Sequence, residues 1–269
     1  MKLTDKIMLD APIVIDESIS QGALEKASVL SFPEEKQSDL QYIRSIMVST
    51  GTNKNGAHFL AGEMLRAHNT VVNKAIDVEH KEEEVIGHIY DCAFLYKSGE
   101  QFDPKKVSAQ YSESGRNVDE LDLDIAVAGV IHKLRFASIA EEIARGEWKV
   151  SMECYFKNFD VKIGNTIITR QEAELLGLSA EQLVGSFVKV VAGRKELGTH
   201  TAARVLRDIT FSGMGIVKKP ANPRSIIMET ANIKQQMGRN NMVVDLEAVD
   251  NIRGKVINIT SKKADPYLL

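Results

Sequence analysis

Apolar and polar side chains alternate over several short stretches of the chain, which is the spacing of half-buried β-strands. β-branched residues inside these stretches and turn formers around them favour the same structure. Strands are predicted over residues 7–15, 43–48, 74–80, 85–95, 148–156 and 204–217. The acidic stretch 81–84 joins two of them, so a hairpin is expected with His80 near its bend.

Helical spacing of apolar residues is confined to three segments. They are Phe59–Ala67, Ala137–Arg145 and Thr169–Leu183. The stretches between the periodic segments are rich in polar and turn-forming residues, and we expect loops at 49–56, 98–118 and 193–204. Pro220 and Pro223 end the last strand, because proline cannot continue a strand ladder.

Residues 229–269 differ from the preceding part of the chain. They are mostly polar and hold only two short apolar runs, at 242–246 and 256–259. We therefore expect the main globular domain to end near residue 228 and to be followed by a flexible, separable C-terminal appendage.

The composition is that of an ordinary globular protein, with 269 residues of which 43% are hydrophobic. Its 34 basic and 37 acidic residues are mixed along the chain and give a net charge of -3, so no nucleic-acid or membrane partner is predicted. The two cysteines, Cys92 and Cys154, have neither metal-ligand nor disulfide-framework spacing. A reducing, cytoplasmic compartment is expected.

Ser151 and Glu153 are the candidate chemical groups of strand 148–156. With a side-chain period of two they lie on the same face of that strand. A serine nucleophile also needs a base and donors for the oxyanion, which the fold must bring from other elements. No GxSxG elbow is present. For Glu153, a structural role and a place at the rim of a substrate site are equally consistent with the pattern.

The acidic residues around 77–84 suggest a metal site. Consecutive acids in a strand point to alternate faces, however, and acids in a turn are usually hydrated. A solvated charged turn is therefore favoured, and neither a metal nor a cofactor is predicted.

Four segments read together resemble the prohead proteases of tailed phages. They are the Gly/Asn-rich loop before Phe59, the pair DVEH (77–80) and IGHI (86–89), VSME (150–153), and residues 211–225 with the sequence PANP. In that family a histidine closes the first motif, the nucleophilic serine lies in an SME-type strand, and a PANP-type segment follows the last core strand. The resemblance covers residues 43–228.

The resemblance implies an α+β fold related to herpesvirus assemblin, with an antiparallel β-barrel-like core flanked by helices. It implies His80 and Ser151 as the catalytic pair. The third catalytic residue would lie on the strand after the serine, where Asp208 is carried over, with His200 and Ser212 as weaker substitutes. Residues 1–228 would then form the protease domain.

The implied function is a serine endopeptidase that cleaves scaffold and major capsid proteins during prohead maturation in the host cytoplasm. The alternative is an inactive structural or scaffolding component of the prohead. Homodimerisation is implied by the relationship to assemblin. Such proteases are made as precursors, so self-processing at the chain ends is expected, with candidate sites after Glu17 and Glu229.

Overall fold

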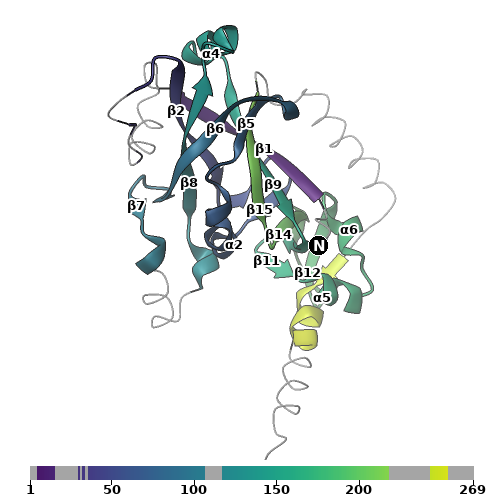
Figure 1. The fold of residues 1–269 in the computed structure, drawn as a ribbon. Coiled ribbons are helices and arrows are strands. Elements are labelled where there is room, and N and C mark those ends of the chain that lie inside the picture. The colour runs from purple at the N-terminus through teal and green to yellow at the C-terminus, as the bar shows by residue number, and fades with distance from the viewer. Residues whose placement is uncertain are drawn as a thin grey trace, which may run out of the picture. The chain divides into compact units, whose positions relative to one another are not determined.

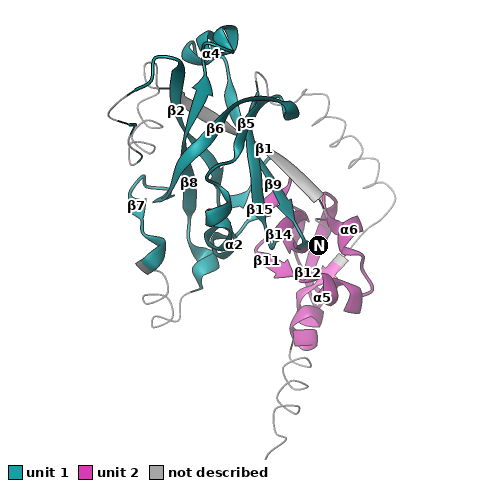
Figure 2. Ribbon diagram, viewed as in Figure 1, with its two compact units in different colours: residues 1–55, 59–158, 206–225 teal, residues 56–58, 159–205, 226–269 magenta. Residues whose placement is uncertain are grey.

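A computed structural model describes residues 5–15, 30, 32–33, 36–106, 117–217 and 243–253; for 5–15, 106 and 243 it describes the backbone alone. The chain divides into two compact units (Figure 2). Unit 1 consists of residues 1–55, 59–158 and 206–225, and unit 2 of residues 56–58, 159–205 and 226–269. No helix in the described part of the chain is long and apolar enough to cross a bilayer.

An eight-stranded sheet forms the framework of unit 1 (Figure 1). Its strands, in spatial order, are β5 (Ala75–Val78), β15 (Thr210–Val217), β9 (Lys149–Phe156), β1 (Asp5–Ile15), β2 (Leu40–Ser49), β8 (Leu123–His132), β6 (Lys81–Tyr96) and β7 (Gln101–Phe102). A further pairing of β5 with β6 joins the two sides of this row, so that the sheet curls on itself. The predicted α+β class with a barrel-like sheet is confirmed, although β5 and β15 run parallel.

Strands β8 and β9 are buried on both faces over most of their length. In β8 every residue from Leu123 to Ile131 is buried, and small residues such as Ala126 and Gly129 let neighbouring side chains approach closely. In β9, Val150, Met152 and Cys154 are each 0% exposed. Because side chains alternate along a strand, the residues between them face the other side of the sheet.

Two short helices of unit 1 occur where the spacing predicts them. They are α2 (Ala61–Ala67) and α4 (Ala137–Ala144), and α4 is followed by Gly146 at φ 74°. Single-turn 3₁₀ helices occur at 68–70, 104–106 and 118–120. A loop was expected over residues 98–118. The structure instead has β7 and the 3₁₀ helix 104–106 within this stretch, and the 3₁₀ helix 118–120 at its edge. Residues 107–116 are outside the described residues.

Unit 2 contains the remaining strands and two short helices. The strands are β4 (Ala57–Phe59), β10 (Asn158–Ile163), β11 (Thr166–Ile168), β12 (Phe187–Ala192), β13 (Lys195–Thr201), β14 (Ala203–Arg207) and β16 (Val243–Asp245); the helices are α5 (Arg170–Leu175) and α6 (Ala180–Leu183). The neighbours run in the orders β11-β10-β14-β4 and β13-β12-β16. The two-residue strand β3 (Gly51–Thr52) follows β2 in the chain.

Three predicted elements of the second half differ from the structure. The single helix expected over 169–183 is two helices, because Gly177 at φ 74° ends the first and Ser179 caps the second. The loop expected over 193–204 contains β13, which pairs with β12. The single strand expected over 204–217 is interrupted at Asp208, whose φ of 52° turns the chain between β14 and β15.

Part of the predicted C-terminal appendage belongs to unit 2. Strand β16 pairs in parallel with β12, and residues 246–253 are helical. The Arg253 guanidinium donates hydrogen bonds to the Glu172 carboxylate and to the carbonyl of Ile167. The expected boundary at 228/229 lies outside the described residues.

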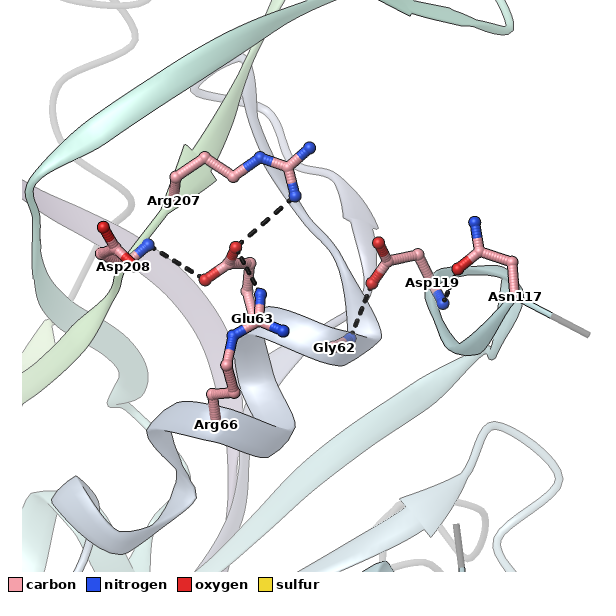
Figure 3. Close-up of polar contacts among 7 residues, drawn as sticks. All are labelled: Gly62, Glu63, Arg66, Asn117, Asp119, Arg207 and Asp208. Atoms are coloured by element: carbon pink, nitrogen blue, oxygen red, sulfur yellow. Dashed lines mark hydrogen bonds and ion pairs between the residues drawn. The ribbon is translucent and has the colours of Figure 1, made fainter. Parts of the chain in front are cut away.

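A buried carboxylate, Glu63, connects helix α2 to the turn that precedes β15 (Figure 3). It is 3% exposed, and it accepts hydrogen bonds from the guanidiniums of Arg66 and Arg207 and from the backbone N–H of Asp208. The Asp119 carboxylate accepts from the Gly62 N–H at the start of the same helix. A charged group that is buried this deeply depends on such donors.

Replacing Glu63 by alanine is expected to lower the free energy of unfolding by about 3 kcal/mol, because the arginines and the Asp208 N–H lose a buried acceptor. Chemical denaturation of the purified variant measures the change. Glu174→Ala, at an exposed position on α5, is the control and should change stability by no more than about 0.5 kcal/mol. Equal effects of the two substitutions would contradict the role given to Glu63.

Candidate active site

Three side chains of unit 1 meet in a hydrogen-bonded row. The Nε2 atom of His80 lies 2.6 Å from the Ser151 Oγ, and its Nδ1 atom lies 2.6 Å from the Glu153 Oε1. A carboxylate only accepts hydrogen bonds, so the proton of the neutral imidazole is on Nδ1 and Nε2 accepts from the serine hydroxyl. The arrangement is that of a nucleophile, a base and an acid that orients the base.

Strand β9 presents two of these side chains from the same face. Ser151 and Glu153 are two residues apart, whereas Met152 between them points to the opposite side. Ser151 is 1% and Glu153 3% exposed, and the His80 side chain keeps 13% of its surface exposed. The serine and the carboxylate are therefore held in a rigid, largely dehydrated setting, and the histidine is the member of the row that reaches solvent.

The histidine comes from a strained hairpin turn between β5 and β6. Val78 pairs with Lys81, which leaves Glu79 and His80 as the two turn residues. Both have positive φ, 52° and 60°, which matches a type I′ turn, where asparagine and glycine are usual. The N–H of Glu79 donates to the carbonyl of Ile216 and anchors the turn to β15. Backbone strain of this kind is found most often at functional sites.

The predicted hairpin is thus present, but its turn is displaced. The acidic residues 82–84 were expected in the turn and instead begin strand β6, where they are exposed. The ladder between β5 and β6 is irregular at Asp77, which pairs with Val85, while the next residue pairs with Lys81. The bulge accommodates the three glutamates.

Two glycines of β15 provide the space for the row. In the antiparallel ladder with β9, Gly215 faces Ser151 and Gly213 faces Glu153. A β-carbon at Gly215 would lie 2.6 Å from His80 Nδ1, and one at Gly213 would lie 2.8 Å from Glu153 Oε2. Both distances are shorter than real Cβ contacts, so a side chain at either position would push His80 or Glu153 out of its place in the row. Glycine is required here by close approach rather than by its backbone angles.

A second buried carboxylate, Asp77, adjoins the row. It is 3% exposed, and in the parallel ladder of β5 with β15 it faces Gly215. One ligand atom each of Asp77, His80 and Glu153 lies within 4.8 Å of the others. Sequence reasoning considered Asp77 only among the acidic residues around 77–84 that suggested a metal site, and favoured a solvated turn for them; Asp77 is buried instead.

The structure places Asp208 away from His80. Asp208 is exposed in the turn before β15, with its backbone against Glu63 (Figure 3). Thr210, at the start of β15, is separated from Gly215 by about 17 Å along the strand. The position next to His80 Nδ1 is taken by Glu153. This geometry does not support Asp208 as the orienting acid.

The two weaker substitutes are not paired with His80 either. His200 is an exposed residue of β13 in unit 2. Ser212 belongs to β15 and lines a cavity that also borders Asp77 and Glu153. Both ring nitrogens of His80 have their partners in Ser151 and Glu153.

Neither cysteine is suited to nucleophilic chemistry. Burial, with a smaller contribution from the Asp91 charge, raises the pKa of the Cys92 thiol to about 11. The reactive thiolate is therefore scarce at neutral pH. Cys154 is 0% exposed on the face of β9 opposite Ser151. Among the described residues, the serine is the better candidate nucleophile.

No model of a known protein family matches the chain, and no curated protein matches its sequence. Among solved structures, the chain is similar to the capsid assembly protease of bacteriophage T4. That match has a TM-score of 0.41 and 10% sequence identity, and it covers 81% of this chain and 100% of that chain. A likeness this weak does not establish a shared fold.

Glu79→Asn is expected to raise the free energy of unfolding by about 1 kcal/mol, because asparagine tolerates positive φ better than glutamate. Elsewhere in the described residues, the non-glycine positions with positive φ are Asn73 and Asp208, whose side chains tolerate this conformation. Thermal and chemical denaturation measure the gain. Glu83→Asn, at an exposed position of β6, is the control; an equal gain there would show that the effect does not come from the turn.

Proposed function

We propose that the chain is a serine endopeptidase with Ser151 as nucleophile, His80 as general base and Glu153 as the orienting acid. The observation that carries the proposal is the pair of 2.6 Å contacts from the two ring nitrogens of His80, one to a serine hydroxyl and one to a buried carboxylate. Hydroxyl, imidazole and carboxylate in this order form a relay that recurs on unrelated folds.

The geometry indicates how the relay would work. Ser151 Oγ attacks the carbonyl carbon of the scissile peptide bond while its proton passes to His80 Nε2. The imidazolium then protonates the leaving amine, and an ester to Ser151 remains. A water molecule, deprotonated by the same nitrogen, hydrolyses that ester and restores the serine. Throughout, Glu153 holds the Nδ1–H and stabilises the imidazolium.

Scaffold and capsid proteins are the proposed substrates, and the assembling prohead in the host cytoplasm is the proposed site of action. The support is the sequence resemblance of the DVEH, IGHI, VSME and PANP segments to prohead proteases. Homodimerisation remains part of the same proposal. A purely structural prohead protein, the alternative, would need neither the strained turn at His80 nor the paired glycines that make room for the relay.

Ser151→Ala, His80→Ala and Glu153→Gln are each expected to reduce proteolysis by several orders of magnitude, because members of such a relay act as a unit. Cleavage of co-expressed scaffold and major capsid protein is the readout, and circular dichroism checks the fold. Wild-type cleavage by a correctly folded variant would falsify the role of that residue.

Asp208→Asn is the matched control for the acid. Its side chain lies outside the row, and asparagine tolerates the positive φ of this turn, so near-normal turnover is expected. If Asp208→Asn were inactive and Glu153→Gln active, the acid would have to be reassigned to Asp208.

Self-processing at the chain ends is expected on the same proposal. Glu17 and Glu229, the candidate sites, lie outside the described residues, and the test is therefore chemical. Intact-mass spectrometry should show shortened chains for the active protein and the full 269 residues for Ser151→Ala. If a preparation that cleaves its scaffold substrate keeps the full-length mass, self-processing is ruled out. If the chain is shortened at other positions, only the sites after Glu17 and Glu229 are excluded.

A further inference from the structure

Asp77, His80 and Glu153 together have the composition of a transition-metal site. We propose that they bind a divalent cation, with Zn²⁺ the best fit, and that the bound ion reversibly switches off the serine. The inhibitory part rests on the proposed function, whereas the binding part does not. Imidazole nitrogen and carboxylate oxygen are ordinary ligands of zinc, and three protein ligands leave a fourth position for water.

The three donors are close to the required spacing. Ligand atoms around tetrahedral zinc lie about 3.4 Å apart, given metal–ligand bonds of about 2.0–2.2 Å. In the structure one donor atom from each residue lies within 4.8 Å of the other two, and His80 Nδ1 lies 2.6 Å from Glu153 Oε1. Metal binding would lengthen the His80–Glu153 separation from 2.6 Å to about 3.4 Å and would replace the hydrogen bond between them.

Strand register brings two of the donors together beside Gly215. Asp77 and Ser151 face Gly215 from its two neighbouring strands. A β-carbon at Gly215 would lie 2.6 Å from His80 Nδ1 and 3.1 Å from Asp77 Oδ1. Both donor atoms therefore border the place where any other residue would have a side chain.

A cavity gives the carboxylates a route to solvent. It has a volume of about 420 Å³, and its lining includes Asp77, Glu153 and a third acid, Glu82, together with Lys74. Three acids against one lysine favour the entry of a cation. Neither Ser151 nor His80 lines this cavity, so an entering ion would meet the carboxylates before the imidazole and the nucleophile.

Metal binding at His80 would stop catalysis through the histidine tautomer. Zinc bonds to a nitrogen lone pair, so binding at Nδ1 moves the imidazole proton to Nε2. Nε2 then donates to Ser151 Oγ and has no lone pair with which to accept the serine proton. The ion also takes over the Glu153 oxygen that orients the ring. Removal of the ion by a chelator restores the original tautomer.

Binding is tested first, on Ser151→Ala protein, so that the result does not depend on proteolysis. Calorimetry with Zn²⁺ is expected to show one site, and Co²⁺ should give the visible absorption of a tetrahedral complex. Adding Asp77→Asn or Glu153→Gln is expected to weaken zinc binding by roughly 10- to 100-fold or more. Two variants are used because either one alone could affect folding.

Two control variants test whether zinc binds to residues outside the proposed site. Glu84→Gln removes a nearby exposed acid that is paired with Lys81. The double change His88→Ala and His132→Ala removes a pair of histidines outside the proposed site, whose rings lie 6.2 Å apart. Neither control should change the affinity. Absence of binding, or binding that depends on His88 and His132 but not on Asp77, overturns the proposal.

Inhibition is tested next, on active protein. Zinc is expected to inhibit cleavage at the concentrations at which it binds, and excess chelator should restore the rate. The inhibition curve of Asp77→Asn, normalised to its own metal-free rate, should shift by the same factor as its affinity. Binding without any proteolysis would refute the proposed function and leave the metal site standing. Binding at this site with undiminished proteolysis would refute the switch.

Discussion

The register between β9 and β15 is the constraint on which the site depends. It sets Ser151 against Gly215 and Glu153 against Gly213, so each of these side chains of the hydrogen-bonded row lies opposite a residue that has none. A slip of one residue would turn both side chains to the other face and set bulky Met214 against one of them. The completely buried neighbours Met152 and Cys154 resist such a slip, because it would expose them on the site's face.

The sequence predicted which residues of one strand or hairpin lie near one another. It did not predict which strands pair, and therefore not which distant residues meet at the site. The side-chain period of two placed Ser151 and Glu153 on one face of strand β9. The alternating residues on both sides of DVEH predicted a hairpin with His80 near its bend. Asp208 was taken as the acid because the family resemblance places the third residue on the strand after the serine; the turn at Asp208, with its φ of 52°, leaves no clear signal in the sequence. Asp77 was missed because its neighbours come from strands distant in sequence, which only the parallel β5–β15 pairing reveals.

Function and stability oppose each other at the Glu79–His80 turn. Two residues in left-handed backbone conformations cost about 1–3 kcal/mol each where the side chain is poorly suited. The hydrogen bond from the Glu79 N–H to the Ile216 carbonyl offsets part of this cost. It also fixes the backbone of the turn and thereby the orientation of the His80 side chain. Glu63 has a comparable role at the opposite end of β15, where it secures the turn through Asp208.

The anchor of the histidine turn also sets the time at which the site can form during synthesis. His80 emerges from the ribosome early, but the carbonyl that holds its turn belongs to Ile216, in the last strand of unit 1. Contacts this distant in sequence must wait until both partners have been made. A nascent chain that already contains the histidine, the serine and the glutamate still lacks the strand that assembles them, so the row cannot form before synthesis of unit 1 is nearly complete.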